Sequence, residues 1–468
     1  MTRYTQIKKL DSPAALRDHL ASLDLELPVD QHVEPHGPLA RGTGFTDASA
    51  GAFEIANRFA VLPMEGWDGT IDGHPSDLVR RRWERFGSSG CGLVWGEATA
   101  VVPEGRANPN QLVLDERTVD GIAGLRRLLA DDQVTGLQLT HSGRWSRPEG
   151  DPVPRPAQRH PVLDERTPTP GPLVSDDELD ELAERFVAAA ALARQADFDF
   201  VDVKCCHGYL LHELLGAYRR DGRYGGDFDH RTAFLRRVVE GIRSRVPGLA
   251  VAVRLSAFDL VPYRTGDDGT GEPEDASGLP QPFGGDAAGT GVDLTETDRF
   301  LDLVAELGIG LVCITAGSPY YNPHVQRPAY FPPSDGYQPP EDPLVGVARQ
   351  IAVTAELKER HPALRFVGSG YSYLQDWLPN VGQAVVAAGG TDLVGLGRMM
   401  LSYPDLAADV LAGRPTERRL VCRTFSDCTT APRNGLVSGC YPLDDFYSER
   451  PERATLATIK RSTRRTNR

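Results

Sequence analysis

Three side chains that can donate protons or hydrogen bonds lie within six positions of one another in the middle of the chain. Lys204, His207 and Tyr209 follow a short, mostly apolar run at 198–203, in which β-branched residues are frequent. Such a run is typical of a buried parallel strand. Because α/β folds place their chemistry at the carboxyl ends of such strands, these side chains are candidates for acid–base or electrostatic catalysis.

The residues around this cluster carry a family pattern. The chain has K-C-C-H-G-Y-L at 204–210, Y-G-G at 224–226 and H-R at 230–231. This segment resembles the active-site segment of the old yellow enzyme family, the flavin-dependent ene-reductases. There a strand ends in H-x-x-H or H-x-x-N, followed by G-Y-L, then Y-G-G and an Asn-Arg pair. Lys204 stands where that family has its first His, which is a departure from the pattern.

Apolar strand-like runs alternate with helix-like segments from residue 57 onward. One long amphipathic segment ends near Ala196 and begins with a capping box made by Ser175 and Glu178. Two other segments, Arg231–Arg245 and Leu344–Arg360, have similar periodicity. The predicted strands are Arg58–Met64, Gly92–Ala98, Val134–Thr140, Phe198–Lys204, Leu249–Leu255, Gly310–Thr315, Leu364–Gly368 and Asp392–Gly397.

Eight alternations of strand and helix predict an α/β fold of the (β/α)₈ type, a TIM barrel. The alternative is a doubly wound sheet. That fold usually opens with a glycine-rich dinucleotide-binding turn, and no such turn follows the first strand, where the chain continues E-G-W-D-G.

Three regions are predicted along the chain: an N-terminal extension at 1–45, the barrel at 46–415 and a C-terminal extension at 416–468. The first contains a short helix from Pro13 to Leu25 capped by Ser12. It is interpreted as a surface wrap or an oligomer contact.

Within the barrel, insertions at Trp145–Pro172 and Phe258–Asp293 are rich in Pro, Gly and Asp and are expected to form lids or binding loops, with passive surface loops as the alternative. The last dozen residues are basic and are expected to be disordered.

A phosphorylated ligand is predicted from the turns after the last two strands. Strand seven runs into Gly368, Ser369 and Gly370, and strand eight runs into Gly397 and Arg398. In barrels these loops present backbone N–H groups to phosphate, glycine permits close backbone approach, and arginine binds phosphate bidentately. Ordinary strand-to-helix turns are the alternative interpretation.

The resemblance implies that this ligand is FMN. Arg254 ends strand five, where a cation stabilises the negative charge of a reduced flavin, and Gln138 ends strand three, where an amide can pair with the pyrimidine edge. The resemblance implies further flavin contacts from Pro63, Met64, Glu65 and Ala98. The family usually has a small Thr or Cys where Glu65 stands, so tuning of the flavin potential is expected to differ here.

The function implied by the resemblance is ene reduction. NADPH or NADH reduces the flavin, and hydride then passes from flavin N5 to the β-carbon of an activated alkene. Tyr209 matches the proton donor of the family, while His207 and Lys204 would polarise the activating group. Two alternatives stay open: a flavin-dependent dehydrogenase or oxidase that runs the chemistry backwards, and a barrel that binds a phosphorylated ligand without redox turnover.

Composition limits the partners. A net charge of −14 argues against a general nucleic-acid or anionic-membrane surface, no apolar run is long enough to span a bilayer, and the first residues do not resemble a signal peptide. A cytoplasmic enzyme acting on a small molecule is expected, and a homo-oligomer is left open. Among seven cysteines, Cys422 and Cys428 fall in the region where a larger branch of the family binds a four-cysteine iron–sulfur cluster; Cys440 lies twelve positions on, and a fourth cysteine is missing. Because Phe425 stands where a ligand would be expected, no metal is predicted; free thiols are favoured over a zinc site.

Overall fold

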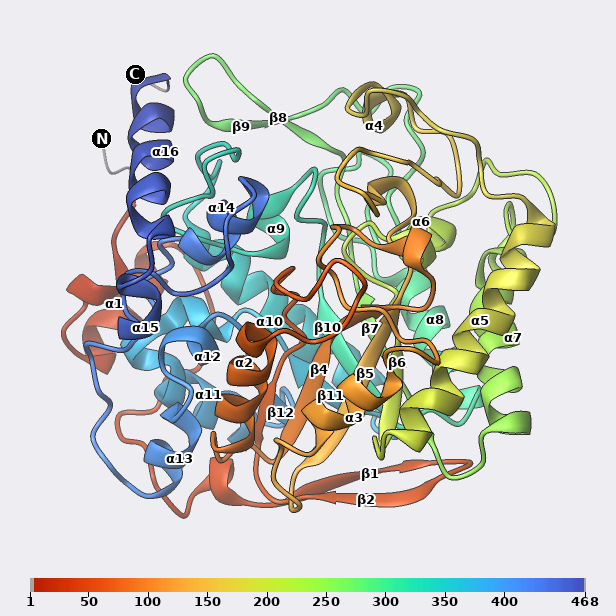
Figure 1. Ribbon diagram of the computed structural model, residues 1–468. Helices are drawn as coiled ribbons and strands as arrows, with labels where there is room; N and C mark the ends of the chain where they lie inside the picture. The colour runs from red at the N-terminus through yellow and green to blue at the C-terminus, as the bar shows by residue number, and fades with distance from the viewer. Residues whose placement is uncertain (1–3, 467–468) are drawn as a thin grey trace.

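The computed structural model describes residues 4–466, and its centre is a closed barrel of eight parallel strands (Figure 1). Around the barrel the strand order is β10-β11-β12-β3-β4-β5-β6-β7. The barrel strands are β3 (Phe59–Val61), β4 (Leu93–Ala100), β5 (Val134–Thr140), β6 (Phe200–Val203), β7 (Ala250–Ser256), β10 (Leu311–Thr315), β11 (Arg365–Gly368) and β12 (Leu393–Leu396). Each lies within or overlaps one of the eight predicted strands, so the predicted TIM barrel is confirmed.

Helices connect successive strands and pack around the barrel. They are α2 (Asp77–Gly87), α3 (Val119–Arg126), α5 (Asp176–Gln195), α6 (Leu210–Leu215), α7 (Phe228–Arg245), α8 (Thr295–Glu306), α9 (Pro323–Gln326), α10 (Pro343–Arg360), the 3₁₀ segment η5 (Tyr371–Trp377), α11 (Leu378–Ala387), α12 (Met399–Ser402) and α13 (Leu406–Leu411). The predicted capping box is present, because Ser175 and Glu178 exchange hydrogen bonds at the start of α5. Helix α7 begins three residues before its predicted start, because the Asp227 carboxylate accepts from His230 N and caps it there. None of the helices between residues 4 and 466 is long and apolar enough to cross a membrane.

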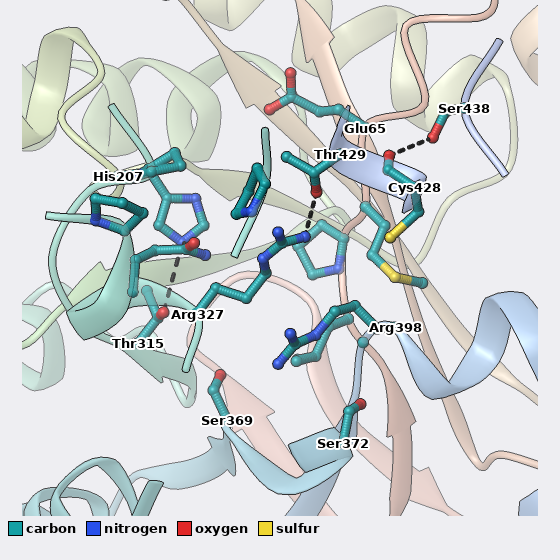
Figure 2. Close-up of a pocket in the computed structure, with 18 of the residues that line it drawn as sticks. Glu65, His207, Thr315, Arg327, Ser369, Ser372, Arg398, Cys428, Thr429 and Ser438 are labelled. Carbon is teal, nitrogen blue, oxygen red and sulfur yellow. Dashed lines mark hydrogen bonds between the residues drawn. The ribbon is translucent and has the colours of Figure 1, made fainter. Parts of the chain in front are cut away.

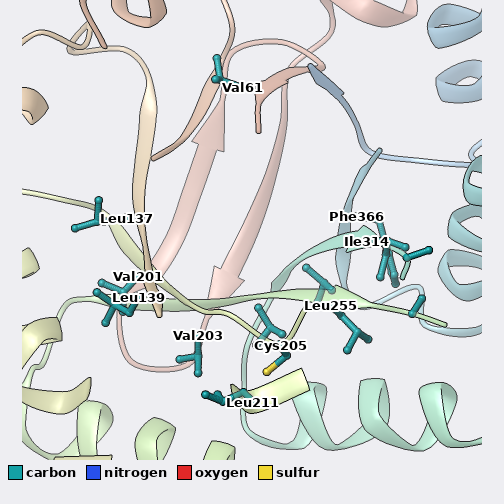
Figure 3. Packing of buried hydrophobic residues seen from close by; sticks show 14 of the residues in the cluster. Val61, Leu137, Leu139, Val201, Val203, Cys205, Leu211, Leu255, Ile314 and Phe366 are labelled. Atoms are coloured by element: carbon teal, nitrogen blue, oxygen red, sulfur yellow. The ribbon is translucent and has the colours of Figure 1, made fainter. Parts of the chain in front are cut away.

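Strand β6 shows how the sequence places side chains on two faces. Successive residues of a strand point to opposite sides. Val201 and Val203 face the surrounding helices, where Figure 3 shows them among other buried apolar side chains. Phe200 packs in the barrel interior, and the Asp202 carboxylate also points inward. The same alternation carries the next interior position to Lys204, just beyond the carboxyl end of the strand.

The lower half of the barrel is filled by aromatic residues. The Phe200 ring lies 5.0 Å from that of Trp95, and 6.5 Å from that of Phe45. Phe45 belongs to a hairpin of β1 (Thr43–Asp47) and β2 (Gly51–Ile55), which lies across the amino-terminal end of the barrel (Figure 1). Gly136 leaves the room that Phe200 occupies, because a Cβ there would lie 2.1 Å from the Phe200 ring.

Above this aromatic layer, Asp202 is the centre of a buried hydrogen-bond network. Its Oδ2 accepts from the Trp95 indole at 2.8 Å and from the Gln138 amide at 2.5 Å, and its Oδ1 accepts from Arg254 N at 2.7 Å. Burial raises the pKa of the Asp202 carboxyl to about 6, although these hydrogen bonds act in the opposite direction. The network joins strands β4 to β7 directly below the residues predicted to do chemistry.

The N-terminal extension packs on the outside of the barrel. Helix α1 (Pro13–Ser22) is capped by Ser12, as predicted, and buries Leu16 and Leu20. Further contacts reach the last helices of the barrel: Trp377 donates to the Leu10 carbonyl at 3.1 Å, and Asn380 donates to the Asp30 carbonyl at 2.9 Å. This arrangement agrees with the interpretation of the segment as a wrap. The predicted domain boundaries themselves stay predictions.

The two insertions lie together at the end of the barrel opposite the β1–β2 hairpin (Figure 1). The first contains α4 (Pro161–Glu165), and the second contains the hairpin of β8 (Tyr263–Thr265) and β9 (Gly271–Pro273). An ion pair at 2.9 Å between Arg166 and Glu274 joins them. The C-terminal region adds α14 (Asp427–Arg433), α15 (Asp445–Ser448) and α16 (Glu452–Thr466).

The expected disorder of the basic tail is wrong for most of its length, because α16 continues to Thr466; residues 467–468 lie outside the described part. The helix is anchored by an ion pair between Lys460 and Asp427 of α14, and by Leu456, which packs against Tyr441 and Tyr447.

Replacing Phe200 by Ala is expected to lower the free energy of unfolding by about 3–5 kcal/mol, because a large cavity would form between Trp95 and Phe45. Urea unfolding followed by far-UV circular dichroism measures this loss. The matched control is Phe446→Ala, since Phe446 is 40% exposed and its loss should have a much smaller effect. Equal effects of the two substitutions would contradict the assignment of Phe200 to the barrel interior.

A second prediction concerns the contribution of Asp202 to the free energy of unfolding at different pH values. Its pKa is higher in the folded protein than in the unfolded chain, so its contribution to stability is present below about pH 4 and is lost as pH rises through about 6. The free energy of unfolding of the wild type, minus that of Asp202→Asn, should fall by about 3 kcal/mol between pH 4 and pH 7. A difference that stays constant or rises would show that folding does not raise the pKa of this carboxyl.

Candidate active site

A single pocket brings together residues from the carboxyl ends of six barrel strands (Figure 2). Strands β3, β6, β7, β10, β11 and β12 all contribute to its wall. Ten of the residues predicted from the sequence line it: Pro63, Met64, Glu65, His207, Tyr209, Arg254, Ser369, Gly370, Gly397 and Arg398. Four do not: Ala98, Gln138, Lys204 and Gly368.

Each of these four residues makes its contacts outside the pocket. Ala98 is fully buried in β4, and the Gln138 amide donates to Asp202. Gly368 ends β11 so close to β12 that a Cβ on Gly395 would lie 2.2 Å from the Gly368 carbonyl oxygen. Lys204 is 2% exposed and is paired with a carboxylate, as described below. These four residues therefore support the pocket wall, and their predicted contacts with a ligand stay predictions.

Arg254 places a buried positive charge in the wall of the pocket. Its Nη1 donates to the Pro63 carbonyl at 3.3 Å, while Nε is buried without a hydrogen-bond partner in the described part of the chain. Its backbone is fixed by the bond from Arg254 N to Asp202. A guanidinium held in this way can stabilise negative charge that develops on a bound ring.

The turns after β11 and β12 form a polar cradle on one side of the pocket. Gly370 has φ of +93°, a conformation that favours glycine. The Ser369 hydroxyl and Arg398 Nη1 are buried without a hydrogen-bond partner among residues 4–466. Arg398 Nη2 donates to the Pro328 carbonyl at 2.8 Å. Unsatisfied buried donors of this kind can bind an acceptor such as the oxygen atoms of an anionic ligand.

Tyr209 and Lys204 meet at one carboxylate. Lys204 Nζ lies 2.7 Å from Glu65 Oε1 and 3.7 Å from the centroid of the Tyr209 ring. Glu65 Oε2 accepts from the Tyr209 hydroxyl at 3.2 Å and from the Trp67 indole at 2.9 Å. The Tyr209 hydroxyl also lies 3.1 Å from that of Tyr320. Burial, followed by the charge of Glu65, raises the pKa of Tyr209 well above its ordinary value, so the phenol keeps its proton.

His207 occupies a constrained turn at the pocket wall. Its φ is +66°, which residues other than glycine seldom adopt. The turn is held at both ends, because His207 N donates to Ser256 Oγ at 3.1 Å and the His207 carbonyl accepts from Ser318 Oγ at 2.9 Å. The ring Nε2 lies 3.3 Å from the Gln326 amide nitrogen. Burial, with the nearby charges of Arg254 and Lys204, lowers the pKa of His207 well below its ordinary value and keeps the imidazole neutral.

Two segments of the pocket wall were not predicted. The loop after β10 and the C-terminal extension together contribute Pro319, Tyr320, Pro323, Gln326, Arg327, Pro328, Pro333, Cys428, Thr429, Pro432, Arg433 and Ser438. The loop could have been noticed, since 319–333 is rich in Pro and aromatic residues in the position where barrels carry function. No residue of either expected lid insertion lines the pocket; Trp145 lies next to it, with its ring stacked 4.3 Å from that of Tyr320, which does line it.

The pocket fits the FMN that the sequence resemblance implies. Its unsatisfied donors, Ser369 Oγ and Arg398 Nη1, are free to bind a phosphate, and the unpaired Arg254 Nε is free to bind a ring that gains negative charge. Among residues 4–466 no group of three or more His, Cys, Asp or Glu side chains is placed to hold a metal ion, and all seven cysteines are free thiols.

Known proteins resemble this chain across the barrel. The model of the NADH:flavin oxidoreductase / NADH oxidase family matches residues 45–272. The NADPH dehydrogenase of Bacillus velezensis is 34% identical over 220 residues, which is 46% of this chain and 64% of that protein. The chain therefore covers less than two thirds of the length of its first relatives, of which that protein is one. A longer match, to the NADPH dehydrogenase of Bacillus licheniformis, is 26% identical over 368 residues, or 77% of this chain and 91% of that protein.

Solved structures agree on the fold. The old yellow enzyme homologue from Zymomonas mobilis superposes with a TM-score of 0.56 at 20% identity, covering 81% of this chain and 93% of that one. At this identity the likeness supports the barrel alone. The family match over residues 45–272 and the curated relatives make the chain similar to the NADH:flavin oxidoreductase / NADH oxidase family, and the solved structure agrees with its barrel fold.

Proposed function

We propose that this protein is an FMN-dependent oxidoreductase that uses NADPH or NADH to reduce the double bond of an activated alkene. The observation that supports this best is the meeting of Tyr209, His207 and Arg254 in one pocket, beside a polar cradle at the ends of the last two strands. The family match and relatives that are NADPH dehydrogenases support the same chemistry.

The cofactor site would use the residues that line the pocket. Ser369, Gly370, Gly397 and Arg398 would hold the phosphate, while Met64 and Arg254 would lie against the ring. The Gln138 amide donates one N–H to Asp202, which leaves its second N–H and its carbonyl oxygen for the pyrimidine edge. Bound FMN would supply the hydride for the β-carbon of the substrate.

Substrate activation would depend on His207 and Tyr209. A neutral imidazole can donate one N–H to the carbonyl or nitro oxygen on which charge develops, which lowers the barrier. The Tyr209 phenol, which keeps its proton at neutral pH, would deliver it to the α-carbon.

Lys204 would act through its neighbours. Because its ammonium is paired with Glu65, it holds that carboxylate in place to accept from Tyr209. Direct polarisation of the substrate by Lys204 would require this ion pair to open. We therefore propose Lys204 as a positioning residue, with His207 as the primary donor.

A second candidate function, desaturation of a saturated substrate, is favoured by the contact between Tyr209 and Glu65. The phenol donates to the carboxylate at 3.2 Å, so Tyr209 could give its own proton to Glu65 as its oxygen takes the proton from the substrate α-carbon. The flavin would then accept the hydride, and oxygen or another acceptor would reoxidise it.

Anaerobic flavin spectroscopy separates these functions. The FMN-loaded protein is mixed with NADPH or NADH and then with enones, nitroalkenes or unsaturated acids. Ene reduction predicts bleaching of the oxidised-flavin band by a nicotinamide nucleotide and its recovery on adding an alkene. If a saturated substrate bleaches the oxidised-flavin band and neither nucleotide does, the protein is a dehydrogenase instead. A protein that takes up no FMN would refute both functions.

Replacing Tyr209 by Phe is expected to slow reoxidation of the reduced flavin by an enone about 10²- to 10⁴-fold, because the proton donor is lost. Reduction of the flavin by NADPH should keep its rate, since no proton from Tyr209 is needed there. Stopped-flow absorbance measures both half-reactions. Tyr371→Phe is the control, because Tyr371 is buried outside the pocket. Loss of both half-reactions in Tyr209→Phe would assign Tyr209 to cofactor binding instead.

A further inference from the structure

Two arginines face the cradle side of the pocket without any carboxylate to balance them. Arg327, which follows α9, and Arg398, in the turn after β12, both line the pocket (Figure 2), and neither forms an ion pair within the described residues. They are linked through the chain, since Arg398 Nη2 donates to the carbonyl of Pro328, the residue after Arg327. Burial lowers the pKa of both guanidinium groups, and the charge of Arg398 lowers that of Arg327 further. Two like charges held this way are unfavourable unless an anion lies between them.

The groups that hold Arg327 are neutral. Its Nη1 donates to the Thr429 hydroxyl and its Nη2 to the Ser426 hydroxyl at 3.4 Å. A hydroxyl satisfies an N–H geometrically but leaves the positive charge in place. Arg433, on the same wall, is different: it forms an ion pair with Asp335 at 2.8 Å. Arg327 is therefore oriented for a ligand, while Arg433 is already neutralised.

The C-terminal extension supplies these hydroxyls through a segment fixed to the loop after β10. Ser426 Oγ donates to the Phe331 carbonyl at 2.6 Å, and Thr424 Oγ1 accepts from Tyr330 N at 3.3 Å. Thr424 and Ser426 have φ of +54° and +60°, in the left-handed region. Strained backbone of this kind persists where surrounding contacts determine it, and here those contacts direct the Ser426 and Thr429 side chains toward Arg327.

We propose that Arg327 is a second cation for the phosphate monoester of the cofactor, and that the C-terminal extension is part of the cofactor site because it holds Arg327 in place. A phosphate monoester carries close to two negative charges at neutral pH, which matches the two unpaired guanidinium groups. Ser369 Oγ, which has no partner, and the Ser372 hydroxyl, which accepts from Met399 N and retains its own hydrogen, complete the donor set. The inference deepens the proposed function, on whose FMN site it rests.

The test compares the binding of FMN with that of riboflavin, which has the same ring but no phosphate. Apoprotein is titrated with each flavin, and quenching of flavin fluorescence gives the two Kd values. Arg327→Gln should weaken FMN binding about 10- to 100-fold and leave riboflavin binding unchanged. Thr429→Val, which removes the hydroxyl that orients Arg327, should change the same ratio in the same direction. The control Arg433→Gln should leave the ratio unchanged.

Each other outcome overturns the proposal. Arg327→Gln could weaken both flavins equally, or neither. If it instead changes the preference for NADPH over NADH while the ratio of FMN to riboflavin affinity stays constant, the anion belongs to the nucleotide. Circular dichroism shows whether each variant is folded, and Arg327→Lys, which keeps the charge, should recover part of the preference for FMN. Wild-type protein that binds FMN and riboflavin equally would refute the phosphate site alone, whereas binding of neither would refute the proposed function.

Discussion

Positive charge buried at the carboxyl ends of the barrel strands is the constraint on which the rest of the site depends. Arg254, Arg327 and Arg398 all line one pocket, and no described carboxylate pairs with any of them. Isolated buried charge is costly, so the surrounding structure must hold each guanidinium by neutral groups until a ligand neutralises it. The carbonyls of Pro63 and Pro328 and the hydroxyl of Thr429 do this here. An anionic cofactor is the simplest partner for such an arrangement.

The sequence was sufficient for the fold because the signals are local. Period-two alternation within β6 places Phe200 and Asp202 inside the barrel, with Val201 and Val203 outside it, and the same pattern holds in β7. A parallel barrel then brings the residues after each strand to one end without further information. For that reason ten predicted residues, from Pro63 to Arg398, share a pocket although they are separated by more than 300 positions.

What could not be predicted depends on side chains that meet across long separations. The ion pair between Lys204 and Glu65 joins residues 139 positions apart, and it removes Lys204 from the set of free donors. The hydroxyl of Thr429 binds Arg327 across 102 positions, in an extension where only the cysteines attracted attention at the level of sequence. The basic tail was expected to be disordered on composition, but α16 is stabilised by Lys460 and Leu456 against α14 and Tyr441. Such packing stabilises a helix that composition alone does not predict.

The most direct measurement of the central claim is a crystal structure of the protein grown with FMN. The unpaired arginines predict a phosphate within hydrogen-bond distance of Arg398 and Arg327, with the ring between Met64 and Arg254 and its reactive face toward Tyr209 and His207. A flavin bound elsewhere, or a pocket in which another anion bridges the arginines and FMN is excluded, would contradict the assignment of this barrel as a flavin enzyme site.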